Sequence, residues 1–117
     1  DIYTSLLSGS ECLTLPAQRS ERRNSYWFYT VVLDKEISEY RDKIINGLRS
    51  RGIETRPTFV PLHRMPVYQD YRRPSQRFPV SEHIGDAGIS LPSGIKMTER
   101  DVERVAEALL DEICKYV

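Results

Sequence analysis

The sequence predicts an α+β fold, a small two-layer domain in which helices pack on a short, mainly antiparallel sheet. One observation is an uncharged run of aromatic and β-branched residues at 26–33, which is typical of a strand at the centre of a sheet. The other is a pair of amphipathic helical patterns, at 38–51 and at 98–113, separated by short apolar runs. With 117 residues, the chain has the length of a single domain.

The N-terminal segments are short. Residues 2–7 could be the tail of a longer helix, and Ile2, Leu6 and Leu7 would then form an apolar face without a partner. Such a face favours self-association, so we expect these residues to be exposed and the protein to form a homodimer. An apolar run at 12–16 ends in a proline, and the polar residues that follow it predict a loop.

The segment 26–33 is aromatic and β-branched and carries no charged side chain, so we expect a strand covered on both faces. Its most conspicuous residues are Trp27 and Tyr29. We interpret both as part of the sheet core rather than as side chains that stack on a ligand.

Apolar residues recur every three to four positions in 38–51, which predicts an amphipathic helix. Ser38 is placed to cap this helix, and Gly52 is placed to end it. The next run, 53–60, alternates loosely and contains Pro57, so it predicts a strand that is interrupted or lies at the edge of the sheet.

The second half predicts a structured loop at 61–79 with one helical turn, a short helix at 81–87 and a brief strand at 89–92. Thr98 then caps the last helix, with Asp101 three residues later as a short variant of the capping box. The apolar stripe of this helix is Val102, Val105, Ala106, Leu109 and Ile113.

The charge is balanced overall, with 17 basic and 17 acidic side chains, but it is unevenly distributed. Segment 49–77 carries seven arginines and two carboxylates, whereas 81–117 has an excess of acid. An anionic ligand would therefore meet the middle of the chain, while the balanced total disfavours nucleic-acid binding. The longest uncharged stretch is too short to cross a membrane. We expect a cytoplasmic protein with Cys12 and Cys114 reduced, and Cys114 buried beside the last helix.

Residues for self-contained catalysis are few. His63 and His83 lie twenty positions apart with no ligand-type spacing around them, so we expect no metal site. The carboxylates Glu103, Glu107 and Asp111 share one helix face, and we interpret this face as solvated. A small enzyme with a Cys or His nucleophile is a third, weakly supported class of function.

The segment 54–77 has the strongest functional character. Its prolines restrict the backbone, so little conformational entropy is lost on binding, and it displays Arg56, His63, Arg64 and Tyr68. These side chains suit phosphate or carboxylate recognition, although a rim loop with solvated arginines would show the same spacing. One hypothesis is therefore a free-standing α/β binding module that uses 54–77 for an anionic ligand or partner.

Four motifs in order carry a family resemblance. They are Asn-Ser-Tyr-Trp-Phe-Tyr at 24–29, Arg-Gly-Ile-Glu-Thr-Arg-Pro-Thr-Phe-Val-Pro-Leu-His-Arg-Met-Pro-Val-Tyr at 51–68, Phe-Pro-Val-Ser-Glu at 78–82 and Gly-Ile-Ser-Leu-Pro-Ser at 88–93. Together they resemble the C-terminal domain of the DegT/DnrJ/StrS family of pyridoxal-phosphate sugar aminotransferases, and within it the perosamine-synthetase-like members.

This resemblance implies an aspartate-aminotransferase-like fold, in which residues 1–117 form the small C-terminal domain as a single unit. It also implies an enzyme of polysaccharide biosynthesis that aminates a keto nucleotide sugar, with glutamate as donor. A large N-terminal domain, absent from this chain, would be its partner and would supply the Schiff-base lysine and most contacts to pyridoxal phosphate. The four lysines here, Lys35, Lys43, Lys96 and Lys115, match no cofactor motif. We therefore expect the chain alone to be inactive, with no catalytic residue and no bound cofactor.

The resemblance further implies that Arg56 and His63 face the substrate cleft, with Tyr68 as a weaker third substrate-binding residue. Many relatives carry His or Tyr where this chain has Val60. A polar contact from that position would be missing here, so the resemblance does not determine which sugar is bound.

Overall fold

The computed structural model describes residues 2–71, 73 and 75–117, and it confirms the α+β prediction. Its sheet has four strands in the order β1-β2-β4-β3, with every neighbouring pair antiparallel. The strands are β1 (Leu13–Thr14), β2 (Tyr29–Leu33), β3 (Arg56–Pro57) and β4 (Gly88–Leu91). β3 is an edge strand, as Pro57 predicts, because proline has no N–H to donate to a second neighbour.

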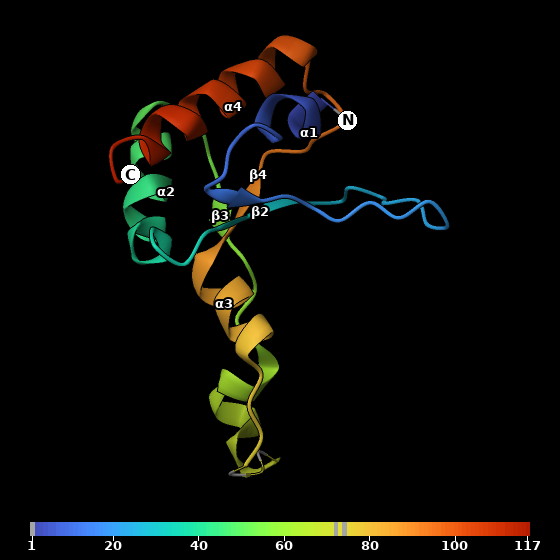
Figure 1. The fold of residues 1–117 in the computed structure, drawn as a ribbon, viewed down its shortest axis with the longest axis vertical. Coiled ribbons are helices and arrows are strands. Elements are labelled where there is room, and N and C mark those ends of the chain that lie inside the picture. Colours follow the sequence, from blue (N-terminus) through green and yellow to red (C-terminus); the bar gives the residue numbers. More distant parts are fainter. Residues whose placement is uncertain (1, 72, 74) are drawn as a thin grey trace.

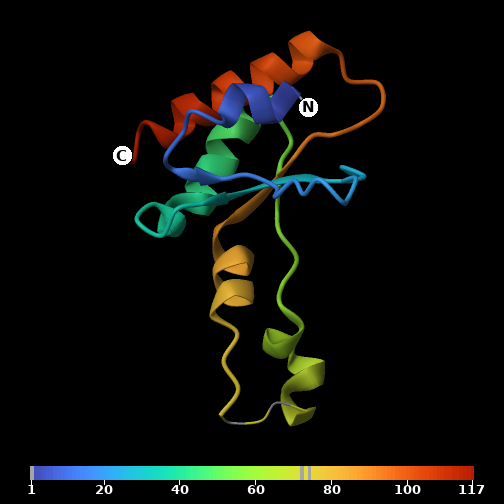
Figure 2. The ribbon, with the colours of Figure 1, turned by 45° about the vertical axis from the view of Figure 1, so that its right-hand side comes forward.

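Helices pack around this sheet (Figure 1). They are α1 (Ile2–Leu7), α2 (Arg41–Ser50), α3 (Pro79–Ala87) and α4 (Glu99–Ile113). Short 3-10 helices are η1 (Ser38–Tyr40), η2 (Leu62–Arg64) and η3 (Pro66–Tyr71). Figure 2 shows α1, α2 and α4 gathered on one side of the sheet, whereas α3 extends away from the other side. No helix of the described residues is long and apolar enough to cross a membrane.

β2 is a central strand, as predicted, but it is shorter than the apolar run and is not fully covered on both faces. Tyr29, Val31 and Leu33 are buried, while the alternating Thr30 and Val32 are partly exposed. Tyr29 is therefore a core residue, as expected. The same expectation is wrong for Trp27, which lies outside the strand with 76% of its surface exposed.

α2 ends at Gly52 and α4 begins at Thr98, as predicted. The predicted cap of α2 by Ser38 is wrong. The hydroxyl of Ser38 donates to the carbonyl of Lys35 at 2.8 Å, and α2 starts only at Arg41 without a side-chain cap. Gly52 ends α2 with a φ of +74°, a conformation that glycine adopts without strain. Thr98 and Asp101 form the reciprocal capping box at the start of α4.

The C-terminal end of α4 differs from the sequence expectation. Cys114 follows the last turn and is exposed, because the apolar stripe ends at Ile113. Glu112, in contrast, is buried at 4% exposure between α4 and α2, where Lys115 donates to its carboxylate at 2.6 Å. Gly47 of α2 leaves the space for this carboxylate, since a Cβ there would collide with it. Glu103, Glu107 and Asp111 are exposed, as predicted.

The N-terminal helix packs on the chain's own core, which corrects part of the expectation of an unpartnered face. Leu7 is fully buried, and Tyr3 is buried and donates to the carbonyl of Pro92 at 2.9 Å. Ile2 and Leu6 remain 37% and 41% exposed. The physical reason is that α1 packs against α4 and that Tyr3 and Leu7 belong to the chain's core, where the Tyr3 ring lies 4.9 Å from the Tyr29 ring.

The capping box predicts an acid-sensitive contribution to stability. Hydrogen bonds from the Thr98 side chain and backbone lower the pKa of Asp101. A lowered pKa in the folded state gives stability that is present above the ordinary carboxyl pKa of about 4 and is lost as the pH falls through the lowered value. We expect Asp101→Asn to reduce the loss of unfolding free energy at acid pH, here called the acid limb, as measured by urea unfolding across pH. Glu99→Gln, at an exposed first-turn position, should keep the limb; an unchanged limb in Asp101→Asn would contradict the prediction.

Candidate functional site

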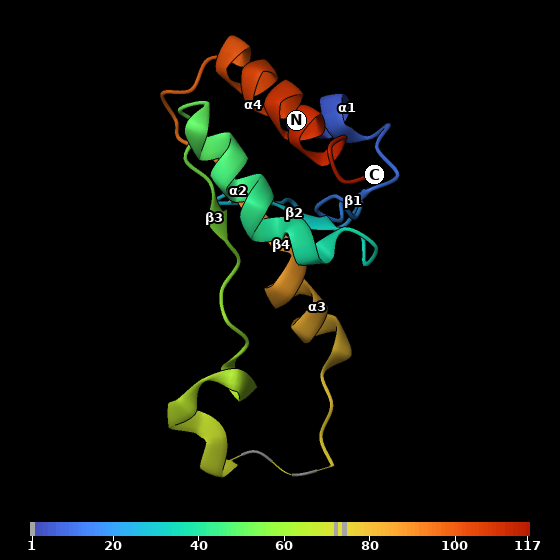
Figure 3. The ribbon, with the colours of Figure 1, turned by 90° about the vertical axis from the view of Figure 1, so that its left-hand side faces the viewer.

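A long excursion between β3 and α3 dominates the shape of the molecule. Residues 58–71, 73 and 75–78 are here called the arm. Residues 58–71 run out from the sheet through η2 and η3, and 75–78 lead back to α3 (Figure 3). Arg72 and Pro74, which belong to the arginine-rich and proline-rich segment singled out in the sequence, lie outside the described residues. The sequence predicts one helical turn in this loop, whereas the structure has two short 3-10 helices there, η2 and η3. Exposed large apolar side chains of the arm are Phe59, Val60, Leu62, Val67, Tyr68, Tyr71 and Phe78.

The base of the arm is hydrogen-bonded to the last turn of α3 and to the first residue of β4. The N–H of Thr58 donates to the carbonyl of Gly88 at 3.1 Å, and the Thr58 hydroxyl donates to the carbonyl of Ile84 at 2.6 Å. Gly88 has no room for a side chain, because an added Cβ would lie 2.6 Å from the Ile84 carbonyl oxygen and would collide with Thr58. This close approach holds the arm in a defined direction relative to the sheet.

Two polar contacts join the outgoing side of the arm to α3. Nε2 of His63 lies 3.0 Å from the carboxylate of Glu82, and the His63 ring packs at 4.7 Å on Phe78. Arg64 donates to Asp86 at 2.5 Å, which lowers the pKa of that carboxyl group. The side chain of His63 is only 13% exposed. In the described chain, His63 therefore braces the arm and does not line an open cavity.

A cavity of about 770 Å³ lies where β3 and β4 meet the start of α4. Its walls include Trp27 and Phe28 before β2, Arg56 of β3, and the loop after β4 from Pro92 to Ile95. Arg56 donates to Glu54 at 2.7 Å, and both side chains are about three-quarters exposed at 76% and 74%. An exposed ion pair of this kind contributes little stability, so the guanidinium can exchange Glu54 for an anionic ligand.

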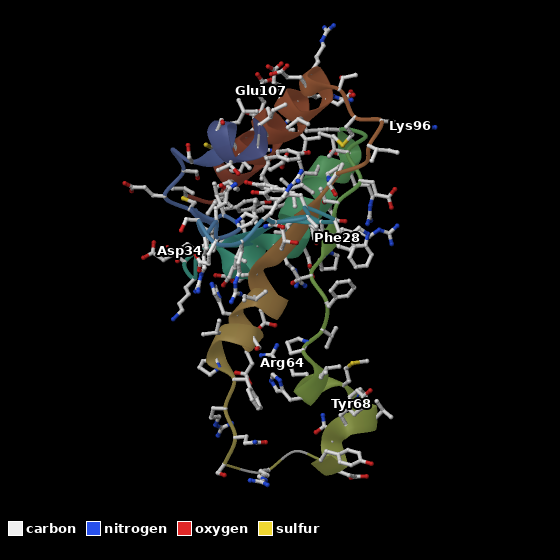
Figure 4. The ribbon with its side chains drawn as sticks, turned by 90° about the vertical axis from the view of Figure 1, so that its right-hand side faces the viewer. Phe28, Asp34, Arg64, Tyr68, Lys96 and Glu107 are labelled. Carbon is white, nitrogen blue, oxygen red and sulfur yellow. The ribbon has the colours of Figure 1, made fainter. Side chains whose placement is uncertain are left out.

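The three sequence-predicted residues do not share this cavity. Arg56 lines it, whereas His63 lies between the arm and α3, and Tyr68 lies on η3 far out along the arm (Figure 4). Tyr68 is 42% exposed. Within the described residues, only Arg56 of the three thus faces an open hollow.

Sequence reasoning missed the aromatic wall of the cavity, a name used here for Trp27 and Phe28. Trp27 and Phe28 pack ring to ring at 4.6 Å, and Phe28 meets Phe59 edge-on at 6.1 Å. All three are exposed, at 76%, 42% and 79%. Periodicity assigns this aromatic run to a strand, and the one local signal against that assignment is Asn24, whose side chain accepts from the N–H of Tyr26 at 3.0 Å and forms a turn.

The lysines of the chain do not provide a cofactor site. Lys115 bonds to Glu112, and the ammonium group of Lys43 lies 5.1 Å above the Tyr40 ring. Lys35 and Lys96 are exposed, and Lys96 points away from the body of the molecule (Figure 4). None of the four lines the cavity. A Schiff-base lysine requires a desolvated pocket, and the surroundings of these four lysines do not fit that need of pyridoxal phosphate.

The fold matches a known class of enzymes. A putative sugar aminotransferase from Streptococcus pneumoniae, solved in its PMP form, superimposes with a TM-score of 0.86 over 100% of this chain and 29% of its own, at 23% identity. This match covers part of an aminotransferase fold and confirms the expected fold type.

Sequence comparison identifies the family. The model of the DegT/DnrJ/EryC1/StrS aminotransferase family matches residues 1–110, and the chain belongs to this family. It is 37% identical to GDP-perosamine synthase of Caulobacter vibrioides over 83% of the chain, and 32% identical to GDP-perosamine synthase of Vibrio cholerae over 93%. The chain spans only 26% and 29% of the length of these two relatives.

Proposed function

We propose that the chain is the C-terminal small domain of a cytoplasmic pyridoxal-phosphate-dependent aminotransferase that aminates a keto nucleotide sugar. Glutamate is the proposed amino donor, and the chain alone is inactive. Family membership supports the reaction class, and the names of the two GDP-perosamine synthases support a nucleotide-sugar substrate. The short coverage of those relatives supports a larger protein in which residues 1–117 are one domain.

The observation that carries this proposal is the position of Arg56. Its guanidinium projects from an edge strand into an open cavity, and its partner there is the exposed Glu54. A planar guanidinium binds a carboxylate or phosphate through two parallel hydrogen bonds. We therefore assign Arg56 to the anionic group of the substrate or of the amino donor.

The cofactor belongs to the part of the enzyme outside this chain. Pyridoxal phosphate, when bound there, supplies the electron sink for amino-group transfer. The cavity residues of this chain act on the substrate instead. Arg56 holds an anionic group, and Trp27 and Phe28 exclude water from one side of the cleft.

The arm is the proposed contact with the rest of the enzyme. Its residues Val67, Tyr68 and Tyr71 expose 69%, 42% and 82% of their surface. Several large apolar side chains left in solvent on one short segment favour an interaction surface. We propose that the large domain and the second subunit of a homodimer cover it. In that assembly His63 and Tyr68 stand at the outer rim of the substrate cleft.

Removing the competitor of Arg56 should strengthen substrate binding. In the full-length enzyme we expect Glu54→Gln to lower one KM by about two- to fivefold, because an exposed ion pair of modest strength no longer competes. The KM in question is that of the substrate, glutamate or nucleotide sugar, whose anionic group Arg56 binds. Steady-state kinetics with glutamate and a 4-keto nucleotide sugar measure this, with the amino sugar identified by mass spectrometry. Glu107→Gln, on the solvated face of α4, is the matched control. A KM that rises in Glu54→Gln alone would contradict the role of Arg56.

A further inference from the structure

Tyr26 has an unusual backbone conformation. Its φ is +48°, and no other non-glycine residue in the described part of the chain has a positive φ. The left-handed region is unfavourable for a residue with a Cβ, and it persists only where the surroundings impose it. Tyr26 lies directly between the polar segment 17–25, here called the finger, and the aromatic wall.

Contacts on both sides fix this conformation. The N–H of Tyr26 donates to the side chain of Asn24 at 3.0 Å, and Gln18 of the finger donates to the Tyr26 hydroxyl. The Tyr26 ring stacks on the buried Tyr29 at 5.8 Å, with 23° between the planes. One residue later, the hydroxyl of Ser93 donates to the Trp27 carbonyl at 2.9 Å.

The left-handed turn has a direct consequence for the cavity. Tyr26 turns its ring inward, where it packs against the core, and Trp27 is 76% exposed beside Arg56. In a regular strand, side chains alternate between the two faces of the sheet, so Trp27 would lie on the same face as the buried Tyr29. In the structure, β2 begins only at Tyr29 and Trp27 lies outside it. The turn therefore separates the aromatic wall from the sheet.

We propose that Tyr26 is a positioning residue whose left-handed backbone holds Trp27 over the Arg56 cavity, where the Trp27 ring packs on the sugar ring of a substrate whose anionic group Arg56 binds. The identity of the ligand, a nucleotide sugar, rests on the proposed function. The positioning of Trp27 by Tyr26 is argued from the backbone conformation and contacts alone. Tyr26 touches no reacting atom and acts through Trp27.

A matched pair of variants separates backbone conformation from side-chain packing. Tyr26→Asn and Tyr26→Val both remove the stacked ring and the hydroxyl, and their side chains are similar in size. Asparagine is among the residues that tolerate the left-handed region best, whereas a β-branched residue is rarely found there. Only the valine variant should therefore release Trp27.

The fluorescence of Trp27 reports the outcome. Trp27 is the single tryptophan of the chain, so its signal in the full-length enzyme is obtained by subtracting the spectrum of a Trp27→Phe variant. We expect Tyr26→Asn to retain the wild-type emission maximum and acrylamide quenching of Trp27, and Tyr26→Val to change both. Tyr116→Val removes a comparable stacked tyrosine, paired with Tyr40 at 4.6 Å, and should leave both readings unchanged.

Kinetics provide the second reading. We expect Tyr26→Val to raise the KM for the nucleotide sugar by about three- to tenfold, the contribution of one aromatic contact, with Tyr26→Asn near the wild-type value. Equal fluorescence changes in both Tyr26 variants, or no change in either, would overturn the positioning role. If the fluorescence separates the two variants but the enzyme transfers no amino group to a keto sugar, the proposed function fails and the positioning of Trp27 stands.

Discussion

Arg56→Ala should raise the KM for the anionic substrate of the full-length enzyme by about ten- to a hundredfold, the loss of a charge-assisted, two-point hydrogen bond. Its folding should be unaffected, because the side chain is 76% exposed and its partner Glu54 remains solvated at 74%. Steady-state kinetics and a urea unfolding curve on the same preparation separate the two effects.

Two companion variants sharpen this test. Arg56→Lys keeps the charge but loses the planar fork, so we expect a KM between those of the wild type and Arg56→Ala. Arg49→Ala removes an exposed arginine of α2 that does not line the cavity, and it should leave KM unchanged. An Arg56→Ala enzyme with normal kinetics would show that Arg56 is only a solvated rim residue.

Gly88→Ala should lower the free energy of unfolding by about 2 kcal/mol, the usual cost of forcing extra volume into a packed site. The new Cβ would lie 2.6 Å from the backbone carbonyl of Ile84, which cannot move without disturbing the end of α3. It would also displace Thr58 and break the two hydrogen bonds at the base of the arm. We therefore expect faster amide hydrogen exchange at Thr58 in addition to the loss of stability.

Gly94→Ala is the control for Gly88→Ala, since an added Cβ at Gly94 would have no atom of the described residues within 4 Å apart from Gly94 itself and its two chain neighbours. We expect its free energy of unfolding to stay close to that of the wild type. Equal stabilities of the two variants, measured by urea denaturation, would show that the contact between Thr58 and Gly88 does not hold the arm.

Local signals explain the parts of the fold that sequence reasoning predicted. The capping box of Thr98 and Asp101, the helix end at Gly52 and the edge position of Pro57 each depend on the chemistry of one or two neighbouring residues. These features need no knowledge of distant contacts. For the same reason, the α+β order of elements was predictable from hydrophobic periodicity.

The incorrect predictions concern residues whose environment is set by distant parts of the chain. Trp27 is exposed directly after Tyr26, whose φ is +48°, and the Trp27 carbonyl accepts from Ser93, far along the sequence. Cys114 is exposed because the apolar stripe by which α4 packs on other elements ends at Ile113. Of the candidate site, the sequence placed Arg56 in an anion-binding segment, but the cavity in which it lies depends on the packing of β3, β4 and α4.

The most direct test of the central proposal is to locate the lysine that binds the cofactor in the full-length protein. Reduction with borohydride in the presence of pyridoxal phosphate fixes the cofactor to its lysine, and peptide mass spectrometry identifies the modified residue. If the chain is the small domain of an aminotransferase, the adduct lies on a lysine outside residues 1–117. A specific, stoichiometric adduct on Lys35, Lys43, Lys96 or Lys115 would contradict this account.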